Sequence, residues 1–150
     1  MASSSAEMHE TVAERLGSVG QRFTPKRREI VEILERAGRP LTIAAILEAG
    51  HSLAQSSVYR NLVVLEEAGA VHRVVTRDGV SRYEMTEDLM GHHHHLVCTR
   101  CGSVEDVPAG EGLENSMADA VAQIDRSTGF TTDHHRLDLV GLCRRCTRPC

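Results

Sequence analysis

Two Cys-x-x-Cys pairs lie in the last third of the 150-residue chain, Cys98 with Cys101 and Cys143 with Cys146. Each such turn brings two thiolates to one point, and two turns supply the four soft ligands of a tetrahedral structural zinc site. Two disulfides or redox dithiols are the alternative, but we find no secretory signal and no thioredoxin-like helix beside either pair. We therefore predict one zinc site with four cysteine ligands. Cys150 is left over, and we expect a free thiol there.

A structural zinc is typical of a small domain. A domain of about 60 residues buries too little apolar surface to be stable unaided, and bound zinc adds the missing stability. The rest of the chain then has room for a second domain. We place this domain in residues 1–85, a hinge in 86–91 and the metal-binding domain in 92–150. The longest apolar run falls far short of the ~18–20 residues that a membrane span needs, so we expect a cytoplasmic protein with no membrane partner.

The charge of the chain limits how it can bind nucleic acid. A net charge of −4 is not typical of a protein that binds DNA through overall charge. Residues 1–85 carry equal numbers of basic and acidic side chains, so the whole excess of acid lies in 86–150. A basic patch is therefore expected only in the N-terminal part, where the one dense basic cluster comprises Arg22, Lys26, Arg27 and Arg28.

Three short helices are predicted in the N-terminal part. Each begins at a capping residue, carries apolar residues at helical spacing and ends at a glycine. For the third helix, Ser52 and Gln55 have the spacing of a capping box. The helices run from Thr24 to Gly38, from Thr42 to Gly50 and from Ser52 to Gly69.

After the helices the sequence changes to the alternation of strands. Two β-rich runs, 71–76 and 80–85, flank Arg77-Asp78-Gly79, and Asp-Gly between such runs indicates a hairpin. Helices followed by a hairpin favour a winged helix-turn-helix. A three-helix core with a hairpin that has no part in function is the alternative.

Beyond the hinge, a small mixed domain is predicted, with strands at 92–97, 103–107 and 132–142 and a helix from 113 to about 129. The fold class is therefore α+β: an N-terminal winged helix-turn-helix domain plus a small C-terminal α/β dimerisation domain with a Zn(Cys)4 site. So small a sheet leaves an edge to be paired, and dimerisation is one solution.

A run of four histidines, His92 to His95, precedes the first Cys-x-x-Cys pair. Successive strand residues point to opposite faces, so His92 and His94 share one face while His93 and His95 share the other. One run can thus contribute to two metal sites. The nearest partners are Glu114 and His135 for the first pair, and Glu84 and His72, across the hinge, for the second. A purification tag is unlike this run, which is internal, and isolated histidines such as His9, His51 and His134 are expected to be solvated.

These residues resemble the ferric uptake regulator superfamily of bacterial metal-responsive transcription factors. The stretch from Ser56 to Gly69 resembles the recognition helix of the superfamily, and the stretch from His92 to Gly102 resembles its sensor and zinc signature. The segment from His135 to Cys146 resembles its C-terminal closure. The similarity extends from about Leu16 to Cys146. It implies a homodimeric repressor with an N-terminal winged helix and a C-terminal dimerisation domain.

The resemblance also implies three metal sites. Cys98, Cys101, Cys143 and Cys146 match the structural zinc ligands; His92, His94, Glu114 and His135 match a regulatory site inside the dimerisation domain; and Glu84, His93 and His95 match a sensor site at the hinge. His94 stands where iron sensors usually have Asp, which favours zinc, because imidazole suits zinc and carboxylate suits harder ions. Zinc sensors often have a cysteine near Glu84, and none is present. Pro40 stands where many members have a histidine, and His72 is the replacement we consider.

We therefore predict a metal-dependent transcriptional repressor, zinc-responsive, with iron(II)-responsive or peroxide-sensing regulation as alternatives in the same superfamily. Its partner would be double-stranded DNA with a near-palindromic operator, since a two-fold dimer requires one. DNA would be contacted by the basic cluster together with Ser56, Ser57, Tyr59 and Arg60. A zinc hydrolase is the alternative from another class, but a catalytic zinc needs an open position and a base above a cleft, and the sequence indicates neither. No enzyme activity is expected.

Overall fold

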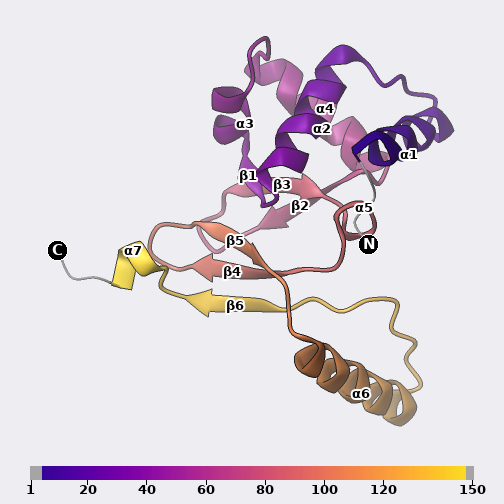
Figure 1. Ribbon diagram of the computed structural model, residues 1–150, viewed down its shortest axis with the longest axis vertical. Helices are drawn as coiled ribbons and strands as arrows, with labels where there is room; N and C mark the ends of the chain where they lie inside the picture. Colours follow the sequence, from indigo (N-terminus) through magenta and orange to yellow (C-terminus); the bar gives the residue numbers. More distant parts are fainter. Residues whose placement is uncertain (1–4, 148–150) are drawn as a thin grey trace.

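The computed structural model describes residues 5–147, which form a helical part on one three-stranded sheet and a smaller part on another (Figure 1). The first part comprises α1 (Ser5–Ser18), α2 (Pro25–Ala37), β1 (Leu41–Thr42), α3 (Ile43–Ala49), α4 (Gln55–Glu67), β2 (Val71–Val75) and β3 (Ser81–Met85). After α5 (Glu87–Met90), the second comprises β4 (His94–Cys98), β5 (Val104–Val107), α6 (Glu111–Thr128), β6 (Asp138–Gly141) and α7 (Arg144–Thr147). The predicted α+β class is confirmed.

The helix starts follow local capping chemistry in two of three cases. The Thr24 side chain accepts a hydrogen bond from the Arg27 backbone N–H, and Thr42 caps α3 in the same way. The prediction for α4 was wrong: the helix begins at Gln55 without a side-chain cap. Ser52 instead donates its hydroxyl to Glu29 Oε2 at 2.8 Å, because α2 brings that carboxylate within reach.

The first helix, α1, was not predicted. Its buried residues Met8, Val12 and Leu16 are four positions apart, so they lie on one helical face and join the core formed by α2, α3 and α4. At its C-terminal end, Arg15 forms an ion pair with Asp88 of α5, and its Nη1 donates to the Gly69 carbonyl at 2.5 Å. The segment predicted as a linker thus contains a short helix that is tied to α1.

The hairpin prediction is confirmed. Strands β2 and β3 pair antiparallel, β1 adds to the other edge of β3, and Gly79 takes a positive φ of 72° in the turn. Along β3, Tyr83 and Met85 belong to the helical core. By the alternation of strand residues, Arg82 and Glu84 lie on the opposite face, toward the second sheet. This face of β3 is where the two parts of the chain meet.

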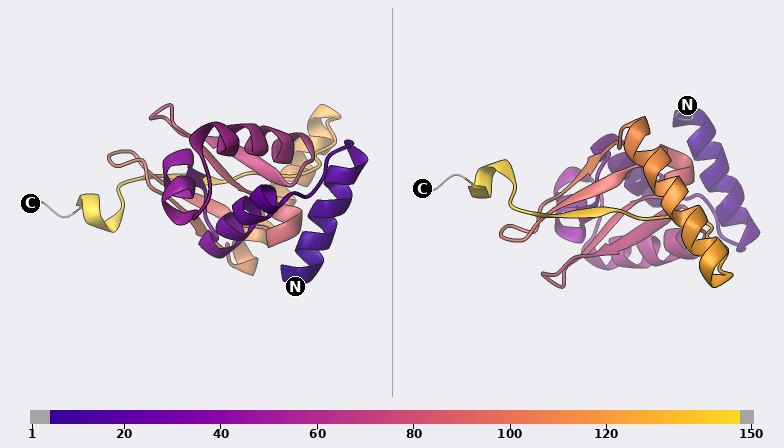
Figure 2. Two further views of the ribbon diagram at one scale, coloured as in Figure 1. Left: turned by 90° about the horizontal axis from the view of Figure 1, so that it is seen from above. Right: turned by 90° about the horizontal axis from the view of Figure 1, so that it is seen from below.

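The second sheet has the order β5-β4-β6, with β4 antiparallel to β5 and parallel to β6. The third strand is shorter than the predicted 132–142, since only 138–141 pair. Figure 2 shows α6 on the side of this sheet away from the winged helices. No residue of α6 is buried within one copy of the chain. In the described part of the chain, no helix is long and apolar enough to cross a membrane.

The role of α1 in the core can be tested by truncating Leu16, which is 0% exposed. We expect Leu16→Ala to lower the free energy of unfolding by about 2–5 kcal/mol, because it leaves a cavity between α1 and the other helices. Val19→Ala is the control: Val19 follows α1 and is 44% exposed, so a change within about 0.5 kcal/mol is expected. Urea unfolding at matched protein concentration measures both, and equal losses would mean that α1 is not part of the folded core.

Candidate metal centres and nucleic-acid interface

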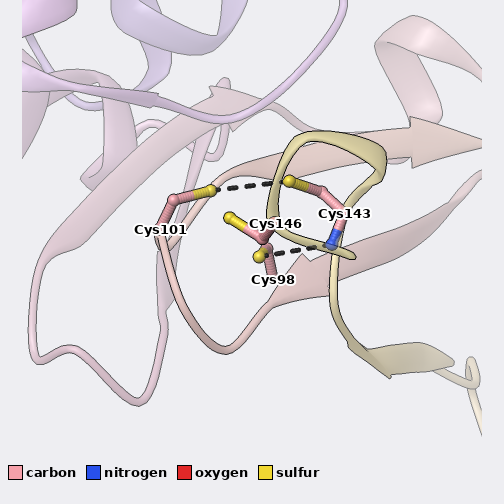
Figure 3. Close-up of side chains that lie close together, drawn as sticks. All are labelled: Cys98, Cys101, Cys143 and Cys146. Atoms are coloured by element: carbon pink, nitrogen blue, oxygen red, sulfur yellow. Dashed lines mark hydrogen bonds between the residues drawn. The ribbon is translucent and has the colours of Figure 1, made fainter. Parts of the chain in front are cut away.

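The four cysteines of the two Cys-x-x-Cys pairs converge on one point (Figure 3). Their sulfur atoms all lie within 4.8 Å of one another, and none of the four is in a disulfide. Cys101 Sγ and Cys143 Sγ are 3.7 Å apart. A tetrahedral ion with Zn–S bonds of about 2.3 Å separates its sulfur ligands by about 3.8 Å. The described geometry therefore fits zinc, as the cysteine spacing predicts.

The protein environment favours a thiolate at part of this cluster. Backbone N–H groups of Cys101 and Cys143 hydrogen-bond to Cys98 and lower its pKa to about 6. Burial and the neighbouring sulfurs raise the pKa of Cys146 to about 12. Without a cation, the four sulfurs cannot all ionise so close together. A divalent ion removes this conflict, since zinc binds thiolates and displaces their protons.

A second cluster lies on the face of β4 that is turned toward α6. It comprises His92, His94, Glu114 and His135, as predicted. His94 Nε2 is 2.6 Å from Glu114 Oε1, and the Nε2 atoms of His92 and His135 are 3.1 Å apart. On the outer side, His92 Nδ1 contacts Glu87 Oε2 at 2.9 Å, the arrangement by which a carboxylate orients a metal-binding imidazole. Three imidazoles and one carboxylate suit zinc or another divalent ion.

The third cluster joins the two parts of the chain. Glu84 of β3 meets His93 and His95, with Glu84 Oε2 at 3.3 Å and 3.1 Å from their Nε2 atoms. Asp106 of β5 completes the group at 3.7–3.8 Å from the same two nitrogens. The outer nitrogens are also bonded, His93 Nδ1 to the Gly91 carbonyl and His95 Nδ1 to Asp138. Both rings therefore direct Nε2 toward one point.

The two carboxyl groups of the hinge cluster, Glu84 and Asp106, are stabilised in their ionised form by nearby positive charge. Burial alone would raise the pKa of Glu84, but its hydrogen bonds to His93 and His95 outweigh burial and lower the pKa to about 2. Burial raises the pKa of Asp106 to about 6, and its Oδ1 is buried with no hydrogen-bond partner in the described part of the chain. An unsatisfied buried carboxylate oxygen beside two imidazole nitrogens fits a metal ligand.

The composition of the hinge cluster differs from the prediction at one position. His72 pairs with Glu84 in the β2–β3 register, but its side chain is exposed and its Nε2 lies 3.5 Å from Arg136 Nη1. Asp106, which the sequence reasoning missed, takes the fourth place instead. The register of β4 and β5 explains this, because Asp106 stands directly opposite His95.

One exposed face of α4 carries three of the eight side chains predicted to contact DNA. Ser56, Tyr59 and Arg60 line an open surface together with Gln55 and Ile43. Tyr59 is 56% exposed, so it is available to a partner. Gln55 was not predicted, although it is the first residue of the helix and lies one turn before Tyr59.

Two other predicted DNA contacts are engaged within the protein. Ser57 is buried, and its oxygens accept hydrogen bonds from Asn61 Nδ2. Arg27 donates to Asn61 Oδ1 at 3.0 Å and to the Arg22 carbonyl at 2.6 Å, which fixes α2 against α4. The structure thus differs from the prediction at Ser57 and Arg27, whose side chains support the helix pair rather than face a partner.

The remaining three basic side chains of the predicted cluster, Arg22, Lys26 and Arg28, are exposed. Arg28 lies over the Phe23 ring, 4.4 Å from its centroid, and its Nη1 is 3.0 Å from His9 Nδ1. It is therefore held in place while staying at the surface.

Comparison with known proteins agrees with this arrangement. The profile of the Ferric uptake regulator family matches residues 18–140. The ferric uptake regulation protein of Bacillus subtilis is 30% identical over 141 residues, which cover 90% of this chain and 91% of that protein. The peroxide operon regulator of the same organism is 32% identical over 142 residues, 90% of each.

Solved structures of metal uptake regulators have a similar fold. The ferric uptake regulator of Vibrio cholerae superposes with a TM-score of 0.68 at 26% identity, covering 87% of this chain and 98% of that one. A zinc-bound manganese uptake regulator superposes with a TM-score of 0.64 at 30% identity, covering 91% and 98%.

A winged helix joined to a sheet with three clusters of metal-binding side chains defines the class: a metal-responsive transcriptional regulator, not an enzyme. In particular, this chain belongs to the ferric uptake regulator family. Members of the family bind divalent metals and bind DNA as dimers.

The cysteine cluster yields the first prediction about the sites. Cys98→Ser should lose zinc and the fold of the second part, because a structural zinc contributes on the order of 10 kcal/mol. Elemental analysis and circular dichroism of the purified protein measure both. Thr99→Ser, in the same turn, should keep one tightly held zinc per chain. A folded Cys98→Ser protein with the zinc content of the parent would contradict the assignment.

The hinge cluster yields a prediction about pH. The hydrogen bond to Glu84 raises the pKa of His93 to about 9, so at pH 7 the metal-free protein carries a proton on this imidazole. Metal binding requires the neutral ring and must release that proton. Metal affinity should therefore fall ~10-fold per pH unit and per released proton as pH drops below about 9. Calorimetry in buffers of different ionisation enthalpy counts the protons. Binding at pH 7 without proton release would refute this.

Proposed function

We propose that this chain is a dimeric, zinc-dependent transcriptional repressor whose switch is the hinge cluster of Glu84, His93, His95 and Asp106. One observation supports the proposal most directly. Glu84 belongs to the strand of the wing, whereas the other three residues belong to the second sheet or to the segment leading into it. A site assembled from both parts is sensitive to their orientation.

We propose the division of the chain into a DNA-binding domain (1–85), a hinge (86–91) and a dimerisation domain (92–150). A divalent ion bound by the hinge cluster would link the two domains in one orientation. The ion favours that orientation only to the extent that it binds more tightly there than in other orientations of the two domains. Both winged helices of a dimer would then fit one face of DNA.

The other two clusters have separate proposed roles. The four cysteines would hold a structural zinc that keeps the end of the second sheet folded. The cluster of His92, His94, Glu114 and His135 would hold a second regulatory ion and fasten α6 to β4, since Glu114 is the residue of α6 that reaches the histidines.

The choice of zinc rests on ligand chemistry. Three imidazoles around one carboxylate favour zinc at the second cluster. Asp106, however, gives the hinge cluster two imidazoles and two carboxylates, a set that also suits iron(II) or manganese. An iron(II)-responsive repressor is therefore the second candidate, and a peroxide sensor that uses iron(II) at the same site is its variant.

A second copy of this chain is the proposed partner of the exposed apolar surface in the C-terminal part. Several large apolar side chains on α6 and β6 are about half exposed within one copy. They include Leu113 (46% exposed), Ile124 (54%), Leu139 (52%) and Val140 (49%). A soluble chain rarely leaves so much apolar surface exposed. The dimer known for the family would cover it.

DNA binding is proposed for the N-terminal end of α4. In a winged helix-turn-helix, this end of the recognition helix enters the major groove. Ser56, Tyr59 and Arg60 would then reach base edges or phosphates, and Arg22, Lys26 and Arg28 would contact phosphates. A two-fold dimer implies a near-palindromic operator. We propose the cytoplasm as the location, because chromosomal DNA lies there in bacteria such as those that hold the relatives.

Metal replacement tests the proposal. An operator is first selected from random duplexes with the zinc-loaded protein. After removal of the regulatory ions by mild chelation, operator binding should be lost. It should return with zinc and not with iron(II), manganese or nickel supplied alone under anaerobic conditions. Recovery with iron(II) alone would replace zinc by iron(II). Operator affinity unaffected by chelation and by every ion would reject a metal-dependent switch.

His93→Ala tests the switch itself. We expect at least a tenfold loss of operator affinity at saturating zinc, with the dimeric mass unchanged, because the hinge cluster loses one of its ligands (~1.4 kcal/mol per tenfold). His72→Ala is the matched control, a nearby histidine whose side chain lies outside the cluster. If both variants bind the operator as the parent does, the hinge cluster is not the sensor.

Arg60→Ala tests the recognition helix. If Arg60 contacts a base, its loss should cost about 1–3 kcal/mol and weaken discrimination at that base pair. If it contacts phosphate, the loss should be similar on every sequence and the salt dependence should flatten by about one unit per contact. Competition between operator and scrambled duplex at several salt concentrations separates the two. Unchanged affinity throughout would mean that α4 does not read DNA.

A further inference from the structure

At the tip of the wing, a buried arginine forms an ion pair with an aspartate whose side chain is 35% exposed. Arg82 of β3 is only 7% exposed, and its Nη2 donates to Asp78 Oδ2 at 2.8 Å. Thr76 and the Val80 carbonyl take further bonds from Nη1. Asp78 also accepts the Val80 backbone N–H. Both terminal nitrogens of the guanidinium therefore donate hydrogen bonds, which compensates for the burial of its charge.

This ion pair lies directly against the first zinc-binding turn. Gly102, the residue after Cys101, is buried and has a φ of +69°. A Cβ at Gly102 would overlap Asp78 Oδ2 and lie 2.8 Å from Arg82 Nη2. The positive φ favours glycine here, and an added Cβ would displace the ends of both side chains. The loop of the wing, which belongs to the DNA-binding half, thus rests on the turn that carries two of the four cysteines.

The same strand that makes this contact also carries the hinge ligand. Arg82 and Glu84 are two residues apart on β3, so they share the face that is turned away from the helical core and toward the second sheet. Arg82 reaches the zinc-binding turn through Asp78, and Glu84 reaches His93 and His95. Two contacts close together on one strand fix both its position and its rotation against the second sheet.

We propose that the docking of the wing loop (76–80) on the zinc-binding turn (98–102) positions Glu84 in the hinge cluster, so that Asp78, Arg82 and Gly102 are positioning residues for metal binding. The proposal deepens the proposed function, on which it rests. By linkage, whatever weakens the wing contact lowers the affinity of the hinge cluster for its ion, although no ligand has changed. The structural zinc then supports the regulatory site through the protein.

The test measures cobalt(II) affinity without DNA. Mild chelation first leaves zinc only at the cysteines of the full-length protein. Every protein compared, the parent included, carries Glu114→Ala and His135→Ala, so that the second cluster keeps only two of its four ligands. The d–d absorption of cobalt(II) then follows the hinge cluster. Gly102→Ala and Asp78→Ala should each raise the dissociation constant on the order of tenfold, within the range of coupled sites. Gly129→Ala is the matched control, because Gly129 has a similar φ of +73° but no atom within 4 Å of an added Cβ. It should bind cobalt as the parent does.

A second measurement reports the contact without any regulatory metal. Amide hydrogen exchange of residues 76–85 should be faster in Asp78→Ala than in the parent, while the zinc content stays the same, since the zinc-binding turn keeps its own residues. Should Gly102→Ala lose its zinc, Asp78→Ala decides the matter. Parent-like cobalt affinity and exchange in Asp78→Ala would overturn the proposal.

The two hypotheses fail differently. A parent that binds no cobalt at the hinge would reject the sensor role of that cluster. Faster exchange of residues 81–85 in Asp78→Ala would still support the positioning of β3 by the wing contact, and unchanged exchange would overturn it. If the parent binds cobalt tightly and Asp78→Ala binds it equally well, the hinge cluster can still be the sensor, but the wing loop does not position it.

Discussion

The arrangement of the two halves depends on one buried carboxylate, Glu84. Its side chain faces two imidazoles and a second carboxylate, Asp106, in a place where water is largely excluded. Two acids and no cation would repel each other there, and burial already raises the pKa of Asp106 to about 6. The group is stable only when positive charge enters it, either as protons on the histidines or as a metal ion. In the proposed function, protons and a metal ion therefore compete for this one cluster.

Strand geometry allows four adjacent histidines to take part in two separate sites. Neighbouring residues point to opposite faces, so the pairs divide between α6 on one side and the wing on the other. His94 and His95 lie on β4, and both are buried. A helix could not divide the run in this way, since its residues are spread around the axis at 100° intervals. The sheet thus lets one short segment contribute side chains to a cluster on each of its two faces.

Local capping was predictable from the sequence, and the long-range groupings that were predicted came from the cysteine spacing, the alternation of strand residues and the family resemblance. Thr24 and Thr42 cap helices with groups from their own turns, so their roles are visible in the sequence. Ser52 fails as a cap because Glu29, far away along the chain, offers a better partner. The position of Asp106 could in principle have been predicted, because a hairpin closed by the Cys98–Cys101 turn places residue 106 opposite residue 95. That step needs the strand register, which the cysteine motif alone does not give.

The three clusters differ in their donor atoms, and we therefore expect them to differ in their affinity for zinc. Thiolates bind zinc more strongly than mixed imidazole and carboxylate groups do, and backbone N–H groups already lower the pKa of Cys98 to about 6. In the proposed function, the cysteine cluster therefore fills first as metal becomes available. The two histidine clusters offer nitrogen and oxygen donors, which bind zinc less strongly than thiolates do, so in the proposed function they fill at higher metal concentration. Such an order would suit the proposed sensor, because the ion proposed to hold the fold must stay bound while the regulatory ion binds and dissociates.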